Sequence, residues 1–305
     1  MCGIAGYIGE EKLQKDKLTK VLSLMNNRGP DNQGVVSFKK NNLNIHLLHT
    51  RLSIIDIDAR SNQPLKYGYC TIIYNGEIYN YIEIRQDLIN KGYHFETDSD
   101  TEVLVKSYIE YGQDCVHHFN GMWAFAIWDE RTNSLFLSRD RFAEKPLYYF
   151  KNEKGFYFGS EIKAIQAMLY EKLQINYNHI KRYLVYGYKF LYKNSDTFFH
   201  GIKEIEFASN ATIDSNMNFI ESKYWFPNED VANISLRDSI EGTRHHLLNS
   251  VRMRLRADVP IAFCLSGGID SASLASIAKK VFDYDVTTFS IIDPDQRYNE
   301  SDNIK

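Results

Sequence analysis

Long apolar runs are absent from this sequence of 305 residues. The longest apolar stretches are strand-sized, such as residues 122–128, whereas a membrane-spanning helix needs about eighteen or more apolar residues in succession. A secretory signal is also lacking, because the mild opening segment leads directly into Glu10 and Glu11 instead of a longer apolar core and a cleavage site. We therefore expect a soluble, cytoplasmic protein.

Closely spaced cysteines and a strong net charge are missing as well. The four cysteines, Cys2, Cys70, Cys115 and Cys264, include no Cys-x-x-Cys pair, which argues against a disulfide framework and a zinc cluster. The formal net charge of -3 offers no bulk attraction to nucleic acid or to an anionic membrane. We expect no partner of either kind and no metal held by protein side chains alone.

The length favours two domains, and the content of 44% hydrophobic and 25% charged residues is ordinary for a globular chain. Up to about residue 160, short strand-like stretches alternate with turns, and helical patterns lie between them. Residues 161–187 favour helices with an interruption near Asn176, and strand-like pieces follow between Phe198 and Trp225. These clusters indicate an α+β layered domain over residues 1–200 and a connector over residues 201–234.

Residues 235–305 have a different pattern. A long amphipathic helical stretch precedes the apolar run IAFCL (261–265), which is followed by SGGIDSAS, a helical LASIAKKVF and a second apolar run, VTTFSII. Strand, glycine turn, helix and strand form a βαβ unit with a buried parallel sheet. Because only about two strands are present and a doubly wound sheet needs more, we expect an incomplete α/β nucleotide-binding domain.

Cys2 stands in the opening segment MCGIAGYIG, whose alternation suits a short buried strand. One interpretation is that Cys2 is a small hydrophobic residue at the edge of a core. The other is that aminopeptidases remove Met1, which leaves a single residue with a thiol and a free α-amine. Such a residue is a nucleophile with its own base.

The SGGIDS segment (266–271) follows an apolar strand and opens a helix, so its backbone N–H groups and the helix end are suited to hold an anion. It matches neither of the two common nucleotide fingerprints, G-x-x-x-x-G-K-[ST] and G-x-G-x-x-G. An ordinary tight turn between strand and helix remains the alternative.

Three further positions are candidates with simpler alternatives. Asn75 and Gly76 form the strongest short hairpin signal, so we expect a turn there, although the Asn75 amide and the Gly76 N–H could together donate to an oxyanion. Arg51 could bind a carboxylate through its fork of donors, or it is a surface residue. Asp100 is expected to be the N-cap of a helix.

Taken together and in this order, the motifs resemble those of the glutamine-hydrolysing asparagine synthetases, and the resemblance covers nearly the whole chain. The motifs are MCGIAGY, RGPDNQG (28–34), HTRLSIID (49–56), YNGEIYN (74–80), SDTEVL (99–104), FNGMWAFAIWD (119–129), LFLSRDRFAEKPLYY (135–149), FGSEIKA (158–164) and LRADVPIAFCLSGGIDSASL (255–274).

The resemblance implies an αββα sandwich of the N-terminal-nucleophile type, a class II glutamine amidotransferase domain, joined to an ATP pyrophosphatase domain. It implies that Cys2 attacks the side-chain amide of glutamine, that Asn75 and Gly76 hold the oxyanion, and that Arg51, Glu77 and Asp100 bind the α-carboxylate and the α-amine. Ammonia would then pass to aspartate activated by ATP. Mg²⁺ is implied together with ATP because the polyphosphate charge must be neutralised. The residues implied for ATP are Leu265, Ser266, Gly267, Gly268, Asp270, Ser271 and Ile291. A homodimer is left open.

The sequence departs from the family pattern at four positions, Ala143, Ala272, Ile292 and Asn299. Ala143 replaces a usual Gly, which affects local backbone geometry. Ala272 removes a hydroxyl from the glycine turn, and Ile292 would crowd an adenine if the backbone must approach it closely.

Two rival interpretations stay open. The first is a relative that amidates another carboxylate, such as a sugar acid. The second is a non-catalytic binding protein with the glutaminase fold that retains Met1. We expect a chain of this length to hydrolyse glutamine without making asparagine.

Overall fold

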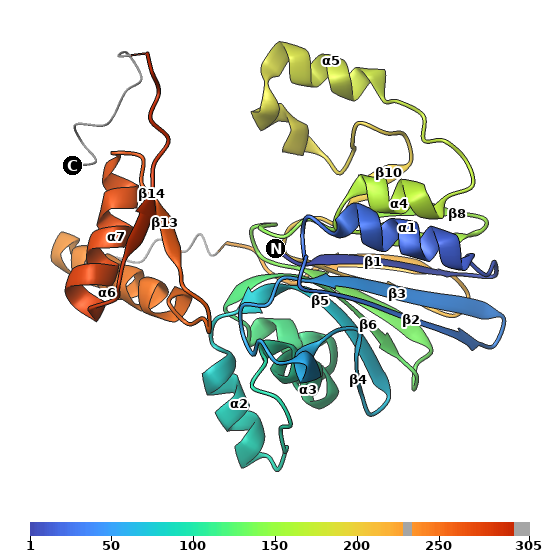
Figure 1. Ribbon diagram of the computed structural model, residues 1–305, viewed down its shortest axis with the longest axis horizontal. Helices are drawn as coiled ribbons and strands as arrows, with labels where there is room; N and C mark the ends of the chain where they lie inside the picture. Colours follow the sequence, from blue (N-terminus) through green and yellow to red (C-terminus); the bar gives the residue numbers. More distant parts are fainter. Residues whose placement is uncertain (228–233, 296–305) are drawn as a thin grey trace. The chain divides into compact units, whose positions relative to one another are not determined.

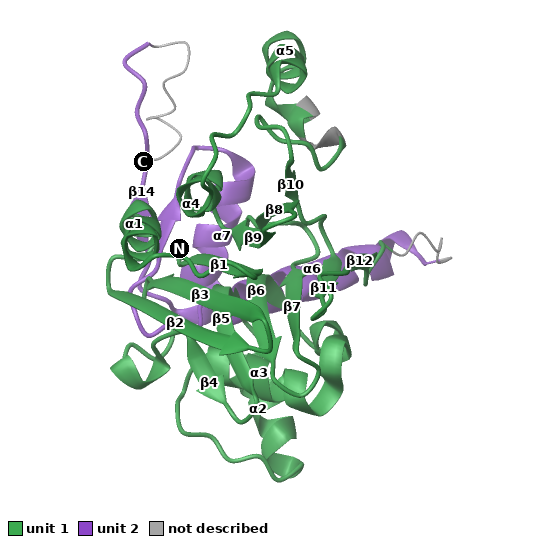
Figure 2. Cartoon of the chain, turned by 90° about the vertical axis from the view of Figure 1, so that its right-hand side faces the viewer, with its two compact units in different colours: residues 1–227 green, residues 228–305 purple. Residues whose placement is uncertain are grey.

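The computed structural model describes residues 1–227 and 234–295, and the chain divides into two compact units, Met1–Pro227 and Asn228–Lys305 (Figure 2). Each unit has its own arrangement of strands and helices, and each is described by itself. Within the described residues no helix is both long and apolar enough to cross a membrane.

Unit 1 contains two six-stranded sheets in which the neighbouring strands are antiparallel (Figure 1). The first sheet has the order β10-β8-β9-β1-β3-β2, with β1 (Gly3–Gly9), β2 (Asn32–Lys40), β3 (Leu43–Arg51), β8 (Tyr148–Asn152), β9 (Gly155–Gly159) and β10 (Ile202–Glu204). The second has the order β12-β11-β7-β6-β5-β4, with β4 (Leu65–Tyr67), β5 (Cys70–Ile78), β6 (Gly121–Asp129), β7 (Ser134–Arg139), β11 (Ser209–Ile213) and β12 (Phe219–Lys223).

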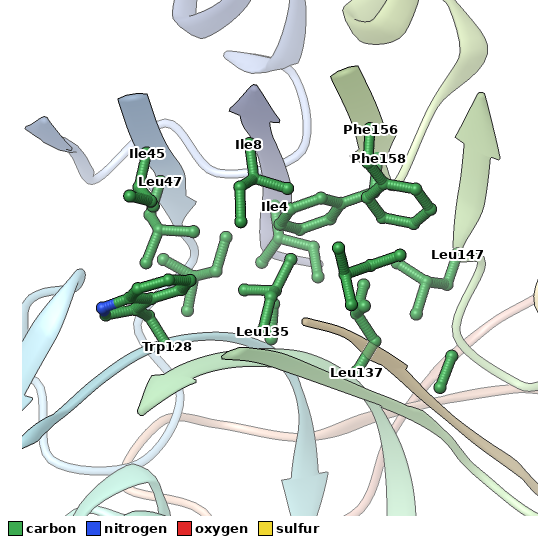
Figure 3. Packing of buried hydrophobic residues seen from close by; sticks show 14 of the residues in the cluster. Ile4, Ile8, Ile45, Leu47, Trp128, Leu135, Leu137, Leu147, Phe156 and Phe158 are labelled. Carbon is green, nitrogen blue, oxygen red and sulfur yellow. The ribbon is translucent and has the colours of Figure 1, made fainter. Parts of the chain in front are cut away.

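The two sheets pack face to face over an apolar layer, shown in Figure 3. Because successive side chains of a strand point to opposite faces, Ile4 and Ile8 of β1 face this layer while Ala5 and Tyr7 face the helices outside. Strand β6 is buried on both faces, which explains why GMWAFAIWD is nearly continuously apolar.

Helices cover both outer faces (Figure 1). Helices α1 (Lys15–Met25) and α4 (Ile162–Met168) pack on the first sheet, and α2 (Tyr81–Asn90) and α3 (Asp100–Tyr111) pack on the second. Helix α5 (Tyr177–Tyr186) follows α4 after an interruption that ends at Asn176, whose side chain caps it. The 3₁₀ helices are η1 (Ala59–Ser61), η2 (Gly112–His117) and η3 (Tyr188–Lys193). The predicted αββα layering is confirmed.

The strand-like pieces between Phe198 and Trp225 are strands β10, β11 and β12. Strand β10 extends the first sheet and the other two extend the second. These residues therefore complete the sandwich of unit 1.

Unit 2 contains α6 (Leu236–Arg254), β13 (Ala262–Cys264), α7 (Ile269–Phe282) and β14 (Thr287–Phe289). Strands β13 and β14 pair in parallel, with α7 as the connection, so this is the βαβ unit that the apolar runs predict.

Two local predictions were wrong. Asn75 and Gly76 form no hairpin turn, because β5 runs through them and both pair with β6, at Ala124 and Trp123. Asp100 is the first residue of α3 and not its cap, because the Ser99 side chain accepts the N–H of Thr101.

Candidate active site

Cys2 lies immediately before β1, next to the end of β3. Its Sγ accepts the N–H of Leu52 at 3.4 Å and lies 3.6 Å from the Leu52 carbonyl oxygen. Its own carbonyl accepts Nε of Arg28 at 2.9 Å. Burial raises the pKa of the Cys2 thiol, and the bond from Leu52 partly offsets that effect. The neutral thiol therefore needs a base before it can act as a nucleophile.

Strand β5 brings Asn75, Gly76 and Glu77 towards this thiol. Asn75 is only 1% exposed, and neither its Nδ2 nor its Oδ1 has a hydrogen-bond partner among the described residues. An unpartnered buried amide is costly, which points to a donor reserved for a ligand. At Gly76 an added Cβ would lie 2.2 Å from the Met122 carbonyl oxygen, so only glycine fits.

Two carboxyl groups, those of Glu77 and Asp100, line the same cavity. Asp100 Oδ2 accepts the hydroxyl of Tyr74 and the N–H of Ile78, both at 2.9 Å. Burial raises the pKa of Asp100 to about 6 despite these bonds. Burial and then the charge of Asp100 raise the pKa of Glu77 well above its usual range. A cation arriving between the two carboxyls would relieve this mutual repulsion.

Arg51 ends β3 beside Cys2, but its terminal nitrogens are already engaged. Nη1 donates to the Asp58 carbonyl and to Asn62 Oδ1, both at 2.8 Å, and Nη2 donates to the carbonyls of Ile55 and Asp56. These contacts tie the segment 55–62 to the end of β3. The proposed fork for a carboxylate is therefore occupied by the chain itself.

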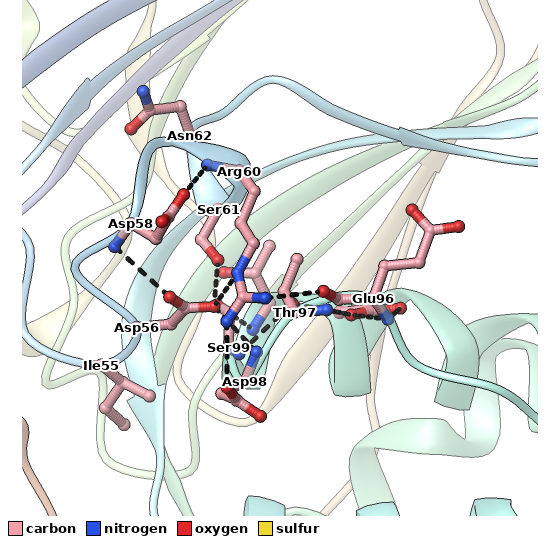
Figure 4. Close-up of polar contacts among 12 residues, drawn as sticks. Ile55, Asp56, Asp58, Arg60, Ser61, Asn62, Glu96, Thr97, Asp98 and Ser99 are labelled. Atoms are coloured by element: carbon pink, nitrogen blue, oxygen red, sulfur yellow. Dashed lines mark hydrogen bonds and ion pairs between the residues drawn. The ribbon is translucent and has the colours of Figure 1, made fainter.

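The segment 55–62 is also fixed from the other side, as Figure 4 shows. Asp56 is 6% exposed, and its Oδ2 accepts Ser61 Oγ at 2.7 Å and the Asp98 N–H at 2.8 Å. Arg60 bonds Asp98 Oδ2 at 2.9 Å. The segment thus links the end of β3 to the start of α3.

The cavity at this place is small, about 20 Å³, which is room for about one water molecule. A larger ligand requires part of its wall to move. Its lining residues are Cys2, Arg51, Leu52, Ile54, Ile55, Ser61, Gln63, Tyr74, Gly76, Glu77, Ser99, Asp100 and Thr101. The fold therefore brings the six residues implied for glutamine together, with Asn75 directly beside this lining.

The second group of predicted residues belongs to unit 2. Leu265 follows β13, and the turn from Ser266 to Gly268 leads into α7, with Gly267 at φ 73 and Gly268 at the N-cap without a side-chain cap bond. Ser271 Oγ lies 3.2 Å from Ser266 Oγ and accepts the Ser266 N–H at 3.2 Å, and Asp270 lies in the first turn. Uncapped amides at the start of a 14-residue helix suit phosphate oxygens.

The other positions of unit 2 that the sequence singled out add little to a nucleotide site. Ile291 is 98% exposed, so the described residues build no wall around it for an adenine. Ile292 is also exposed, and Asn299 lies outside the described residues. Ala272 carries no hydroxyl, and its N–H bonds the Gly268 carbonyl at 3.1 Å. In residues 1–227 and 234–295, no group of three or more His, Cys, Asp or Glu side chains is placed to hold a metal ion.

Two residues at the Cys2 site, Arg28 and Tyr74, had no role predicted from the sequence. Both belong to motifs of the sequence, RGPDNQG and YNGEIYN. The signal was therefore present, but spacing along the chain does not tell which side chain faces the thiol.

Comparison with known proteins agrees with both units. A family described as "Glutamine amidotransferase domain" matches residues 1–225, and one described as "Asparagine synthase" matches residues 242–305. Asparagine synthetase (glutamine-hydrolyzing) 3 of Bacillus subtilis is 38% identical over 295 residues, which cover 93% of this chain and 46% of that protein. A putative asparagine synthetase (glutamine-hydrolyzing) 2 of Methanocaldococcus jannaschii is 34% identical, covering 100% and 62%. The chain thus spans about half to three-fifths of the length of these relatives.

Two further similarities are more distant in length or in sequence. "Amidase chry2" of Gibberella zeae is 32% identical over 91% of this chain and 42% of its own length. Among solved structures, the glutamine phosphoribosylpyrophosphate amidotransferase of B. subtilis aligns over 97% of this chain and 69% of its own, with a TM-score of 0.54 and 15% identity. That level of similarity supports the fold alone, a sandwich of the N-terminal-nucleophile type.

Proposed function

The chain belongs to the glutamine amidotransferase family, and we propose that Cys2, once Met1 has been removed, hydrolyses glutamine to glutamate and ammonia. One observation carries the proposal. A thiol and two carboxyls line one cavity, although they come from distant parts of the chain, and the unpartnered buried amide of Asn75 belongs to the same strand, between the lining residues Tyr74 and Gly76. Hydrolysis of the glutamine side chain needs a nucleophile, a donor to the oxyanion and anionic groups that bind the α-ammonium. The thiol, the Asn75 amide and the two carboxyls can supply them.

The chemistry follows from their positions. The Cys2 Sγ forms a bond to the side-chain carbonyl carbon of glutamine while the thiol proton passes to the Cys2 α-amine. The Asn75 amide and the Gly76 N–H donate to the oxyanion that forms. When the C–N bond breaks, the amine returns the proton to the leaving nitrogen, and ammonia departs from a thioester. Water then attacks the thioester and releases glutamate and the free thiol.

Glutamine binding requires a change in the cavity, which holds about one water molecule. In our proposal Glu77 and Asp100 receive the α-ammonium. Arg51 receives the α-carboxylate, which competes with the carbonyls of segment 55–62 for the guanidinium. The small cavity and the occupied arginine are then coupled, because the ligand that displaces the segment also replaces its contacts with Arg51.

For the second half of the reaction we propose that ammonia reaches a carboxylate activated by ATP, with aspartate as the acceptor, as the names of the relatives suggest. ATP would supply the adenylate that makes the carboxylate reactive, and Mg²⁺ would accompany its phosphates. The residues from Leu265 to Ser271 would hold the phosphates through backbone N–H groups and the two hydroxyls. We expect the present chain to perform the glutaminase half without making asparagine.

The second candidate function is the transfer of ammonia to a carboxylate other than aspartate, such as a sugar acid. The similarity to a fungal protein named as an amidase favours it, since that protein shares the family but not the name of an asparagine synthetase. A third candidate, a binding protein without turnover, predicts that Met1 stays in place and leaves Cys2 without a free amine.

The test begins with the intact mass of the purified chain, which reports whether Met1 is absent. Glutamate, pyrophosphate and asparagine are then assayed in parallel with glutamine, aspartate, ATP and Mg²⁺. We expect glutamate from the wild type, none from Cys2→Ala and at most a trace from Cys2→Ser, since a hydroxyl is a much weaker nucleophile at neutral pH.

The matched controls are Cys70→Ala and Cys115→Ala, which should cost stability alone because both thiols are buried in the core. Glutamate production by a verified Cys2→Ala chain would refute the mechanism. So would its absence in a wild-type chain that has lost Met1. Steady asparagine with matching pyrophosphate would refute the restriction to the glutaminase half.

A further inference from the structure

Tyr74 lies in β5, and side chains from two other segments hold its backbone. The pairing of β4 with β5 ends at Ile72. Two residues further on, the Tyr74 N–H donates to Gln63 Oε1 at 2.6 Å, and the Tyr74 carbonyl accepts Nε2–H of His49 at 3.0 Å. His49 is fully buried and Gln63 is 6% exposed. Both polar groups of the Tyr74 backbone are therefore fixed at the place where the ladder with β4 has ended.

The side chain of Tyr74 extends from β5 to the first residue of α3. Its hydroxyl donates to Asp100 Oδ2 at 2.9 Å, and the same oxygen accepts the Ile78 N–H at 2.9 Å. Tyr74 is 2% exposed and Asp100 is 5% exposed, and both line the cavity at Cys2. A buried hydroxyl of the site thus bonds directly to a carboxyl that is proposed to receive the α-ammonium.

A second link joins the same two elements. Gln63, which accepts the Tyr74 N–H, also donates Nε2 to Thr101 Oγ1 at 3.1 Å. Gln63 and Thr101 line the cavity as well. Because this link does not use the Tyr74 hydroxyl, we expect β5 and the start of α3 to keep their places when that hydroxyl alone is removed.

The charged groups around Asp100 come from each element that walls the cavity. They are Cys2 before β1, Arg51 at the end of β3 and Glu77 in β5. Glu77 repels a negative charge on Asp100, and both Nη1 and Nη2 of Arg51 are engaged by carbonyls of the segment 55–62. The Tyr74 hydroxyl is one of the neutral donors that Asp100 does have.

The protonation states agree with this arrangement. Burial raises the pKa of Asp100 to about 6, and the bonds from Ile78 and Tyr74 act in the opposite direction. Burial and then the charge of Asp100 hold the pKa of Tyr74 well above its usual range, so the hydroxyl keeps its proton and donates. A donor to a carboxylate favours the charged form. Removing the hydroxyl should therefore raise the pKa of Asp100 further.

We propose that Tyr74 is a positioning residue of the Cys2 site: its hydroxyl holds the Asp100 carboxylate in the cavity as an acceptor for the α-ammonium of glutamine. The proposal rests on the glutaminase function proposed above. Tyr74 acts through Asp100, on the binding of the amino group, and touches neither the thiol nor the oxyanion. Its removal should therefore change KM and the pH dependence of KM more than kcat.

The first experiment compares Tyr74→Phe, which removes the hydroxyl and keeps the ring, with Tyr108→Phe. Tyr108 is the matched control, because it is 6% exposed and its hydroxyl lies 3.4 Å from Oδ2 of Asp129, a buried carboxyl outside the cavity lining. The kcat and KM for glutamine are measured between pH 5.5 and pH 8.

For Tyr74→Phe we expect the acidic limb to move upward by about one pH unit, because a bond to a carboxylate is stronger than one to the neutral acid. KM should then exceed that of the wild type by about eightfold at pH 5.5 and by less than twofold at pH 8. The kcat at saturation should change by less than about twofold. Tyr108→Phe should stay close to the wild type at both pH values.

A second measurement needs no turnover: urea unfolding at pH 5 and at pH 8. In the folded chain Asp100 is protonated at pH 5 and ionised at pH 8, since its pKa is about 6. The ratio of unfolding constants, Tyr74→Phe over wild type, should be about eightfold larger at pH 8. Although burial raises the pKa of Asp129, bonds from Arg131 hold it below its usual value, so Tyr108→Phe should cost the same at both pH values.

Three results would overturn the inference. One is a Tyr74→Phe variant whose KM exceeds the wild-type value by the same factor at pH 5.5 and pH 8. Another is a cost in stability that does not depend on pH. The third is a loss confined to kcat. If the wild type has lost Met1 and releases no glutamate, the glutaminase proposal fails, whereas the unfolding constants still test whether Tyr74 holds the Asp100 carboxylate. Should Tyr74→Phe fail to fold, Tyr74→Met removes the same donor with a flexible apolar side chain.

Discussion

The cavity at Cys2 in unit 1 and the glycine turn at Ser266–Ser271 in unit 2 differ in what surrounds them. The cavity is walled by the end of β3, by β5 and by the start of α3. Its Arg51 and Asp100 are buried, as is the neighbouring Asn75 at 1% exposure, while Cys2 and Glu77 are partly buried. The turn lies between β13, of three residues, and α7, and most of its residues are exposed. The first site therefore acts mainly through side chains that packing holds, whereas the second offers mainly backbone N–H groups.

This difference has a physical consequence. A buried site fixes its side chains by packing, so removing one functional group leaves the others in place and reduces the rate. An exposed turn depends on the φ values of a few residues, so a change of backbone freedom affects it most. The following predictions test this contrast, beginning with the largest effect.

Asn75→Ala should lower kcat for glutamine by about 10²-fold, because the oxyanion loses a donor. The same change should leave the melting temperature unchanged or higher, since the Asn75 amide has no partner to lose. Steady-state kinetics measure kcat, and thermal unfolding measures the melting temperature. The control is Asn80→Ala, whose side chain bonds the His118 carbonyl and the Asn120 N–H, and which should lower stability more than activity. Reduced activity in proportion to reduced stability at Asn75 would contradict the role.

Glutamine binding should weaken at acid pH. The pKa of Asp100 is raised to about 6, so the carboxylate that receives the α-ammonium is present above that pH and is lost as the pH falls through it. A drop from pH 7 to pH 5 should raise KM by about tenfold for one titrating group. Circular dichroism at each pH checks that the chain stays folded. Equal KM values at the two pH values would separate these carboxyls from ammonium binding.

In unit 2, Gly267→Ala should weaken ATP binding by about fivefold, because φ 73 is unfavourable for a residue with a Cβ. The kcat/KM for glutamine should change less than twofold, since the turn contributes nothing to the Cys2 cavity. Calorimetry and the glutamate assay measure the two effects. Gly242→Ala, in the interior of α6, is the matched control and should leave ATP binding unchanged. A parallel loss of ATP binding and of kcat/KM for glutamine would contradict the independence of the two sites.

Ala143→Gly should stabilise unit 1 by about 1 kcal/mol, because Ala143 has φ 54, a conformation that glycine adopts without strain. Denaturant unfolding measures the change. Ala167→Gly in α4 is the opposite case, since a glycine inside a helix should destabilise by about 1 kcal/mol. A destabilising Ala143→Gly would mean that the turn at residues 140–145, whose N–H groups donate to the Asp140 carboxylate, depends on the alanine methyl group.

Local patterns predicted a large part of this protein. The helical patterns between the strands of residues 1–160, the long helical stretch that opens residues 235–305, the βαβ unit around SGGIDS and the α+β layering are all confirmed. The resemblance to glutamine-hydrolysing asparagine synthetases is confirmed by the matching families and relatives. These features depend on hydrophobic period, caps and motifs, which are properties of neighbouring residues.

Only the tertiary structure decided how the site is arranged. Asn75-Gly76 is a hairpin signal by itself, but pairing with β6 keeps it in a strand, because a central strand gains more from its ladder than a turn would give. Arg51 has the fork that a carboxylate prefers, yet a loop folded back from residues 55–62 occupies it. The contact between Cys2 and Leu52 joins residues 50 positions apart. Sequence determined which chemical groups are present, and the burial of two sheets against each other determined which of them meet and how far each is shielded from water.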